Sequence, residues 1–170
     1  VTGTNTGITY YGNSNSGFAY TTLTSAANAG SGGFTSGTVG NTNNADVTIG
    51  TAGTPANFTL KALRISGNTS PRQLLFANPT DTLYVESGGI LRSNDNNSSN
   101  IGSAASRGIL TAGSLTVGQL NTPQELFIHN NQNTMTVFSN IVDNPTNSGA
   151  TVKLVKDLGG TVVIDSSFNT

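Results

Sequence analysis

The sequence TVKLVKDLGGTVVIDSSFNT, residues 151–170, decides the fold class of this chain. It holds two short runs rich in β-branched residues, 152–155 and 161–164, and places Gly159 and Gly160 between them. Short apolar runs bounded by turn residues are typical of strands, whereas a helix needs a longer run with a period of about 3.6 residues. Glycine adopts a positive φ angle without steric cost, so the glycine pair predicts a tight corner. The segment therefore predicts two strands joined by a corner.

The composition of the 170-residue chain indicates an ordered all-β structure. Only 9% of the residues are charged and 34% are hydrophobic, against about 25% and about 45–50% in average soluble domains. So low an apolar fraction raises the alternative of disorder. Disordered chains usually carry a high net charge and many prolines, however, and this chain has a net charge of −1 and five prolines. Its apolar residues are also gathered in short runs, and we therefore predict ordered strands.

Strand-like runs recur about every 20–25 residues, separated by Gly, Asn or Pro, as in a solenoid of stacked coils. Residues 58–65 are expected to form one alternating strand, and residues 134–141 are expected to form one of the strand clusters. The spacing also fits an antiparallel β-sandwich, whose turn signals recur about every 8–12 residues. No Asn-Gly or Asp-Gly pair, the usual hairpin signature, lies between two runs. The sequence thus favours a parallel β-helix (a β-solenoid), with Asn and Thr at its corners stacked as ladders between coils.

The chain shows no internal boundary. We expect residues 1–170 to form a single β-solenoid segment, least regular over residues 1–44, and to be a fragment or a repeat unit of a longer chain.

The C-terminal segment also resembles a known family. Residues 154–164, LVKDLGGTVVI, followed by Asn169 and Thr170, are similar to the autotransporter-associated β-strand repeat. That pattern reads approximately L-x-K-x-G-x-G-T-L-x-L and then N-T-Y-x-G-x-T. This chain departs from it at the first glycine, and the sequence stops before the Tyr-Gly part. The motif residues matched are Lys156, Gly159, Gly160, Thr161, Asn169 and Thr170.

The resemblance implies a right-handed parallel β-helix on the outside of a bacterial cell, in a long secreted or surface-anchored protein. The expected function is that of a structural module in an extracellular fibre, stalk or surface adhesin, giving length and rigidity. Expected partners are further copies or neighbouring repeats, and a surface glycan or host-cell ligand. The alternatives are a carbohydrate-binding or polysaccharide-degrading β-helix, and a phage or viral fibre segment.

Two places are candidate ligand contacts. Residues 93–100, SNDNNSSN, contain no apolar side chain and predict a protruding loop. The spacing of Asp95 and Asn97 copies the start of a calcium loop, but the later Gly and Glu are missing, so no metal is predicted. Two adjacent tyrosines near the N-terminus are candidates for stacking on a sugar ring. The candidate residues are Asn94, Asp95, Asn96 and Asn97 in the loop, and Tyr10 and Tyr11 near the N-terminus.

Other functional classes find no support in the sequence. The chain has no cysteine, which excludes disulfides and thiolate metal sites. Its pI is about 5.6 and it has no basic run that would neutralise a row of phosphates, so we expect no nucleic-acid partner. No apolar run approaches the roughly 20 residues that span a bilayer, and we expect no membrane insertion by this segment. No acidic residues form a D-D or D-x-D pair. We therefore expect a non-enzymatic protein without a cofactor.

Overall fold

The computed structural model describes residues 20–22, 36–39, 46–60, 62–65, 72–92, 97–113, 124–146 and 151–165. All regular secondary structure in these ranges is β-strand. The strands are β1 (Tyr20–Thr22), β2 (Ser36–Val39), β3 (Val47–Ile49), β4 (Asn57–Leu60), β5 (Leu63–Ile65), β6 (Arg72–Phe76), β7 (Thr82–Val85), β8 (Gly89–Arg92), β9 (Ser99–Ile101), β10 (Ile109–Ala112), β11 (Gln124–Asn130), β12 (Thr134–Val137), β13 (Asn140–Ile141), β14 (Val152–Asp157) and β15 (Thr161–Ile164).

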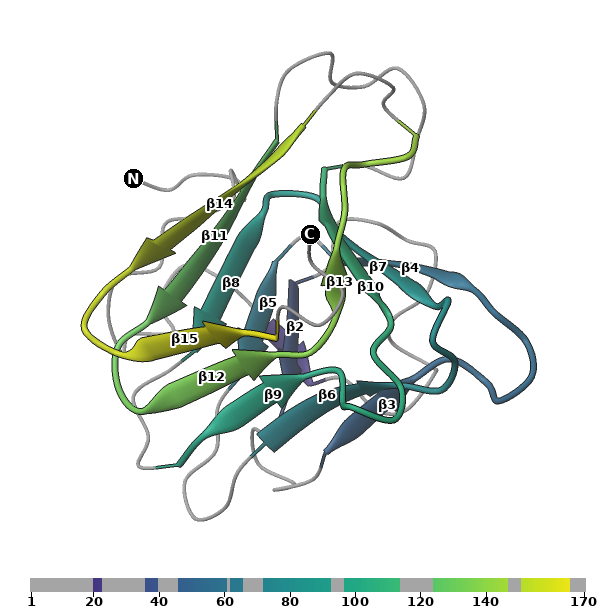
Figure 1. Cartoon of the computed structure of the whole chain (residues 1–170), viewed down its shortest axis with the longest axis horizontal. Coiled ribbons are helices and arrows are strands. Elements are labelled where there is room, and N and C mark those ends of the chain that lie inside the picture. The colour runs from purple at the N-terminus through teal and green to yellow at the C-terminus, as the bar shows by residue number, and fades with distance from the viewer. Residues whose placement is uncertain are drawn as a thin grey trace.

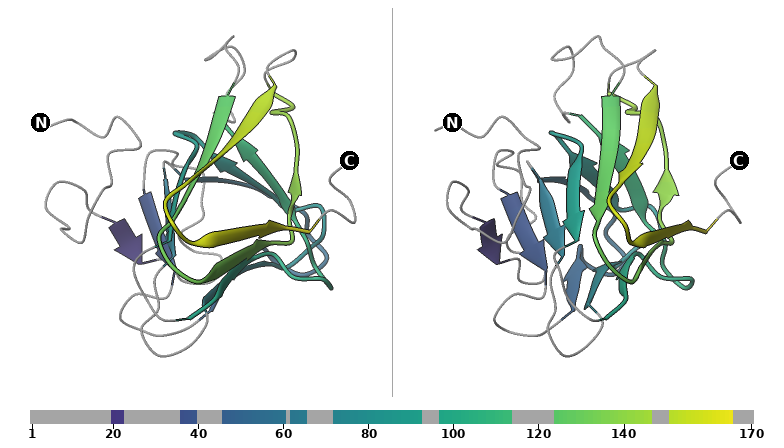
Figure 2. Two further views of the ribbon diagram at one scale, coloured as in Figure 1. Left: turned by 60° about the vertical axis from the view of Figure 1, so that its left-hand side comes forward. Right: turned by 90° about the vertical axis from the view of Figure 1, so that its left-hand side faces the viewer.

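The strands form three parallel sheets around one interior (Figure 1). Sheet 1 has the order β1-β2-β5-β8-β11-β14, sheet 2 the order β15-β12-β9-β6-β3, and sheet 3 the order β13-β10-β7-β4. From β2 onward the chain visits sheets 1, 2 and 3 in turn, so that every coil lies on the one before it (Figure 2). This is a right-handed parallel β-helix. The prediction of a β-solenoid is confirmed, and the β-sandwich alternative is wrong.

The coils are longer than the predicted repeat of about 20–25 residues. Gln73 and its register partner Asn100 on the next coil are 27 residues apart. The sequence separation between register partners on neighbouring coils increases to 38 residues for Arg92 and Asn130. A coil is this long because it contains three strands and three corners. The extra residues of the longest coil lie between β10 and β11, at a corner from sheet 3 to sheet 1.

Aliphatic side chains fill the interior in rows that run from coil to coil. One row from sheet 1 consists of Leu63, Ile90 and Ile128, which are register partners and are all fully buried. Sheets 2 and 3 contribute equivalent rows, including Leu74 with Ile101 and Leu83 with Leu110. Complete burial of one such side chain contributes about 1.5–3 kcal/mol. The stacked rows therefore supply the main stabilisation of the solenoid.

Two of the expected β segments are in fact pairs of strands. Residues 58–65 divide into β4 in sheet 3 and β5 in sheet 1, so the chain changes sheets between Leu60 and Leu63. Residues 134–141 likewise divide into β12 and β13, with the corner at Phe138 and Ser139. The prediction of one strand over residues 58–65 was wrong, and neither of these two corners contains the glycine or proline that would have marked it. The first corner is instead fixed by burial on both sides of it, since Leu60 and Leu63 are both fully buried.

The strand–corner–strand prediction for residues 151–170 is confirmed as far as residue 165, by β14 and β15. The prediction that a glycine supplies the positive φ angle of this corner is wrong, because the residue with that conformation is Leu158, with φ of 69°. Gly160 is required for space instead. A Cβ atom at this position would lie 2.7 Å from Cγ of Asn130, which is too close. The N–H of Gly160 donates to the carbonyl oxygen of Asn130 at 2.8 Å.

The two ends of the stack differ. In the first coil whose side chains are described, Ile49 and Leu60 are fully buried. In the last coil, Leu154 is the register partner of the buried Leu126 and yet is 43% exposed. Val162 and Ile164 are only half-buried. The apolar interior is therefore covered at the N-terminal end of the described stack and open at the C-terminal end.

Candidate functional site

Buried polar side chains gather where the chain turns from one sheet to the next. A buried polar group is costly unless it is hydrogen-bonded, so its partners indicate its use. Most of the partners described below belong to a neighbouring coil, which makes these corners the candidate functional site of the described residues. The buried polar side chains at or beside corners are Asn78, Asp81, Arg92, Ser99, Asn130, Ser139 and Asn144.

The corner between β6 and β7 is held by Asn78 and Asp81. Asp81 is fully buried, and its carboxylate accepts from the Asn78 N–H at 2.9 Å and from the Ala56 N–H of the preceding coil at 2.9 Å. Asn78 donates from Nδ2 to the Thr51 carbonyl at 2.8 Å and accepts from the Gly53 N–H at 2.8 Å. The pair therefore binds the β6–β7 corner to the β3–β4 corner beside it.

The corner between sheets 1 and 2 contains a fully buried arginine. Arg92 donates from Nε to Ser99 Oγ at 3.1 Å, from a terminal nitrogen to Asn130 Oδ1 at 3.3 Å, and to the Gln132 carbonyl. Ser99 is 2% exposed and begins β9, so the expected protruding loop at residues 93–100 is wrong for residues 99–100, which form part of that strand. The hydrogen bond from Arg92 satisfies the hydroxyl of Ser99 in the interior.

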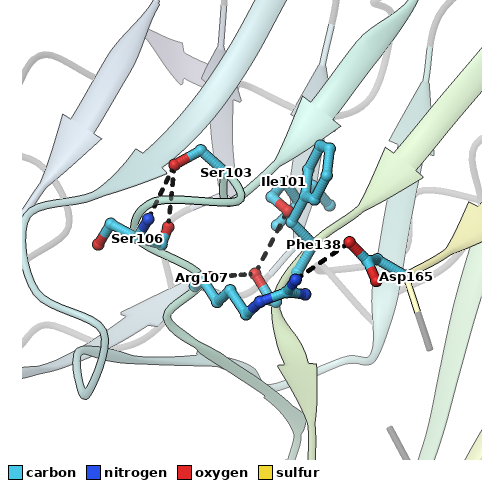
Figure 3. Close-up of polar contacts among 7 residues, drawn as sticks. Ile101, Ser103, Ser106, Arg107, Phe138 and Asp165 are labelled. Carbon is cyan, nitrogen blue, oxygen red and sulfur yellow. Dashed lines mark hydrogen bonds and ion pairs between the residues drawn. The ribbon is translucent and has the colours of Figure 1, made fainter. Parts of the chain in front are cut away.

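A third corner contains the Arg107 bridge, formed by Arg107, Phe138 and Asp165 (Figure 3). Arg107 lies between β9 and β10 and donates to the Phe138 carbonyl of the next coil at 3.0 Å. Its other terminal nitrogen forms an ion pair with Asp165, after β15, at 3.1 Å. The side chains of Arg107 and Asp165 are 14% and 23% exposed. One side chain thus contacts the two coils that follow its own.

The turn that presents Arg107 is fixed by two serines. The Ser106 N–H donates to Ser103 Oγ at 3.0 Å, and that hydroxyl donates to the Ser106 carbonyl at 3.4 Å (Figure 3). The Ser103 N–H also donates to the Ser106 carbonyl, at 3.0 Å. Ser139 of the next coil donates from Oγ to the Arg107 carbonyl at 2.8 Å. These bonds hold the Arg107 backbone in place, so that its guanidinium extends along the solenoid axis.

The outer face of sheet 2 carries a side-chain ladder. The carboxylate of Asp46 accepts from the backbone N–H of Gln73 and from Gln73 Nε2, each at 3.0 Å. Gln73 Oε1 accepts from Asn100 Nδ2 at 3.2 Å. This ladder consists of Asp, Gln and Asn and lies on a sheet face, whereas the expected ladders were of Asn and Thr at the corners. At the corners, Asn78, Asn130 and Asn144 bond to backbone carbonyls of neighbouring coils.

On the outer face of sheet 1, charged side chains lie opposite charged ones and apolar side chains opposite apolar ones, in separate rows. Register partners on β11 and β14 are Glu125 with Lys153, and Phe127 with Val155. His129 Nδ1 lies 3.5 Å from Asp157 Oδ2, and the rings of Phe127 and His129 are parallel within 5° with centroids 6.1 Å apart. The outer face of sheet 3 includes Tyr84, which is 2% exposed, and burial raises the pKa of its phenol above the ordinary value.

Three of the described carboxylates are bonded at separate places. Asp46 contacts Gln73 on sheet 2, Asp81 lies inside a corner, and Asp165 contacts Arg107. Within the described ranges, no three His, Asp or Glu side chains are grouped as a metal site would require. No helix in this part of the chain has the length and apolar character needed to cross a membrane. The chemistry that these groups perform in the fold is hydrogen bonding between coils.

The residues predicted as sites lie in different parts of the chain. Lys156 ends the inward row Leu63–Ile90–Ile128, and its Nζ donates to the Leu158 carbonyl. Gly159 and Gly160 form the next corner, and Thr161 begins β15 and accepts from Asn130. The loop candidate Asn97 is half-buried. The remaining candidates lie outside the described residues; they are Tyr10, Tyr11, Asn94, Asp95, Asn96, Asn169 and Thr170.

Sequence reasoning missed most of the corner residues. One signal was available, because Asn-Pro-Thr occurs at residues 78–80 and again at 144–146. Proline restricts the residue before it to extended conformations, and both asparagines are buried and donate to a carbonyl of the preceding coil. Arg92 and Arg107 had no comparable signal, because their partners become neighbours only when the coils stack.

Comparison of the chain with protein-family models, with curated proteins and with solved structures found no match.

Proposed function

We propose that this chain is a structural β-helical module of a bacterial extracellular fibre, stalk or surface adhesin, and that its role is to provide length and rigidity. The observation that carries the proposal is the use of its buried polar side chains. Asn78, Asn130 and Asn144 each donate from Nδ2 to a carbonyl of a neighbouring coil. The Arg107 bridge joins a coil to the two that follow it. Such bonds resist separation of the coils along the axis.

The proposal puts the module outside the cell and gives it copies of itself as partners. A chain without cysteine, with few charges and many Asn, Thr and Ser residues, suits an extracellular bacterial protein. Self-association or continuation into neighbouring repeats would cover Leu154, which is 43% exposed on the last described coil. Adhesion to a glycan or a host-cell ligand would then belong to loops and not to the sheet faces.

The arrangement of the carboxylates favours this function over polysaccharide hydrolysis. Glycoside hydrolysis needs two carboxyl groups about 5–10 Å apart on either side of the scissile bond. Asp46, Asp81 and Asp165 instead bond to residues of three different corners or faces. Their structural use supports a non-enzymatic module.

The test measures the length of the particle that contains this chain. Strands in neighbouring coils are about 4.8 Å apart, so the four steps from β3 to β15 account for about 19 Å of axis. Tandem duplication of the chain should lengthen the particle by at least that amount in electron-microscope class averages, and duplication of residues 63–89, one complete coil, should lengthen it by one strand spacing. Duplication of half a coil is the control, since it breaks the register and should unfold the module. An unchanged length, or saturable binding and cleavage of a polysaccharide by the isolated chain, would overturn the proposal.

A further inference from the structure

The peptide bond between Asn78 and Pro79 lies in the corner between β6 and β7, beside a buried carboxylate (Figure 1). Asn78 is 7% exposed and Asp81 is fully buried, whereas Pro79 is exposed. The carboxamide nitrogen Nδ2 of Asn78 lies 3.1 Å from Oδ1 and 3.2 Å from Oδ2 of Asp81. A carboxamide N–H and a proton acceptor are therefore in contact next to this bond.

An asparagine that precedes proline has one cyclisation open to it. In other Asn-X sequences, the backbone nitrogen of the next residue attacks the side-chain carboxamide, and the asparagine is deamidated. Proline has no backbone N–H, so that reaction does not occur at Asn78. The remaining route is attack of Nδ2 on the carbonyl carbon of the same residue. It closes a five-membered imide and breaks the chain.

We infer that the chain cleaves itself between Asn78 and Pro79 by this route, with Asp81 as the general base. The Asp81 carboxylate accepts a proton from Nδ2, and Nδ2 forms a bond to the Asn78 carbonyl carbon. The bond from that carbon to the proline nitrogen then breaks, and this nitrogen takes the proton from Asp81. One C–N bond forms and one breaks, and Asp81 is regenerated. The products are residues 1–78, ending in the imide, and residues 79–170, beginning with proline.

Two backbone donors are in place for the charge that develops in this step. The Asp81 N–H donates to the Asn78 carbonyl oxygen at 3.2 Å. This oxygen becomes negative when its carbon is attacked, and a donor already in position stabilises it. The Gly53 N–H donates to Asn78 Oδ1 at 2.8 Å. That bond stabilises the charge that the carboxamide gains as Nδ2 loses its proton.

The neighbouring coil holds both reacting side chains. Asn78 Nδ2 donates to the Thr51 carbonyl at 2.8 Å, and the Ala56 N–H donates to Asp81 Oδ1 at 2.9 Å. The Asn78 N–H donates to Asp81 Oδ2 at 2.9 Å. Fixed orientation lowers the entropic part of a reaction barrier. Burial of both side chains also keeps out the water that would compete as a nucleophile.

The second Asn-Pro-Thr sequence provides an internal comparison. It is followed by Asn147, whereas the first is followed by Asp81. Asn144 is also buried, and its Nδ2 donates to the Ala112 carbonyl at 2.9 Å. The sequence position of the base is therefore occupied by a carboxamide, which does not accept a proton in this way. We expect cleavage after Asn78 and not after Asn144.

The cut lies in a corner and leaves each described strand whole. β4 pairs with β7, β5 with β8 and β6 with β9, and each of these pairs joins one product to the other. The two products should therefore stay associated while folded and separate in denaturant. The inference adds a self-processing activity to the proposed structural function.

Mass spectrometry of the purified chain, sampled during incubation at neutral pH, tests the inference. The two products should initially have masses that add up to the mass of the intact chain, because ring closure takes up no water. They should elute together in size-exclusion chromatography and separate in urea. A chain kept unfolded in urea from the start should stay intact, because unfolding separates Asn78 from Asp81.

Three variants identify the reacting groups. Asp81→Asn should slow the cleavage at least about a hundredfold by removing the general base. Asn78→Ala removes the nucleophile and should abolish cleavage. Asn144→Ala is the matched control, because it changes the asparagine of the second motif and should leave cleavage after Asn78 unchanged. Heavy water gives a measurement that needs no variant: it should slow the native chain, since a proton is transferred from Nδ2 and then to the proline nitrogen.

Two outcomes would overturn the inference. One is a native chain that stays intact through prolonged incubation, and the other is cleavage that neither Asp81→Asn nor heavy water slows. The proposed function does not depend on either outcome, because the stacking of the coils and the length of the particle do not require the cut.

Discussion

The carboxamide of Asn130 donates a hydrogen bond from Nδ2 to the carbonyl oxygen of Thr161, one coil further along the chain, at 2.6 Å. The same nitrogen donates to the Asn133 carbonyl at 3.1 Å, and Oδ1 accepts from Arg92 at 3.3 Å. Arg92, Asn130 and Thr161 belong to three successive coils. A single buried side chain therefore joins three coils at one corner.

Replacing Asn130 by alanine should destabilise the fold by about 2–3 kcal/mol, because it leaves buried donors and acceptors without their partner. Urea denaturation should show a lower midpoint with an unchanged slope. Asn57→Ala is the matched control. Asn57 is exposed, and its loss should change stability by no more than about 0.5 kcal/mol. Equal shifts for the two variants would contradict the role assigned to Asn130.

The two glycines of the last corner should respond differently to alanine. A Cβ at Gly160 would lie 2.7 Å from Asn130 Cγ and 2.8 Å from its carbonyl oxygen, whereas a Cβ at Gly159 meets only the Asn131 carbonyl at 3.5 Å. Gly160→Ala should therefore cost about 1–3 kcal/mol by overpacking. Gly159→Ala makes ordinary contacts and should be close to neutral in the same thermal or urea denaturation. A larger loss at Gly159 would show that the corner has another conformation.

Arg107 and Asp165 should be coupled in a double-mutant cycle. Their ion pair is partly buried, so we expect a coupling of about 0.5–1 kcal/mol that decreases with added salt. Arg107→Ala should cost more than Asp165→Ala, because it also removes the hydrogen bond to the Phe138 carbonyl. Strictly additive single changes in urea denaturation would mean that the ion pair does not form in solution.

Alkaline pH should destabilise the fold through Tyr84. Burial raises the pKa of its phenol in the folded state, so above the ordinary value near 10 the unfolded chain loses its proton first. The stability that this group contributes is fully present below about pH 10 and is lost as the pH rises through the folded-state pKa. Tyr84→Phe should be less sensitive than the native chain when denaturation midpoints at about pH 8 and about pH 11 are compared. An identical loss in both proteins would assign the effect to other groups.

The strands could be predicted from sequence where β-branched residues were bounded by turn residues, as in β7, β14 and β15. The absence of Asn-Gly and Asp-Gly hairpins correctly indicated parallel pairing. The division of residues 58–65 was not predictable in this way. Asn57–Leu60 and Leu63–Ile65 look like one alternating strand, and only the need to bury Leu60 and Leu63 on different walls of the interior separates them.

The candidate site was less accessible to sequence reasoning. β9 was hidden because the first of its two inward residues is the polar Ser99, which accepts a hydrogen bond from Arg92, and only the second, Ile101, is apolar. The Arg107–Asp165 pair joins residues 58 positions apart, and no local pattern marks either one. Such pairs depend on the lengths of the intervening coils, and the step of 38 residues between Arg92 and Asn130 departs from any simple repeat.

The Arg107 bridge also changes how the solenoid should melt. In a stack where each coil contacts only its neighbours, stability is a sum of nearest-neighbour terms, and the end coil can fray alone. Arg107 adds a second-neighbour term, because it lies before β10 and contacts Asp165 beyond β15. Loss of the terminal coil therefore also removes a restraint on the turn at Ser103 and Ser106, two coils away. Hydrogen exchange at these two places should be correlated, so that the last three coils behave as one cooperative unit.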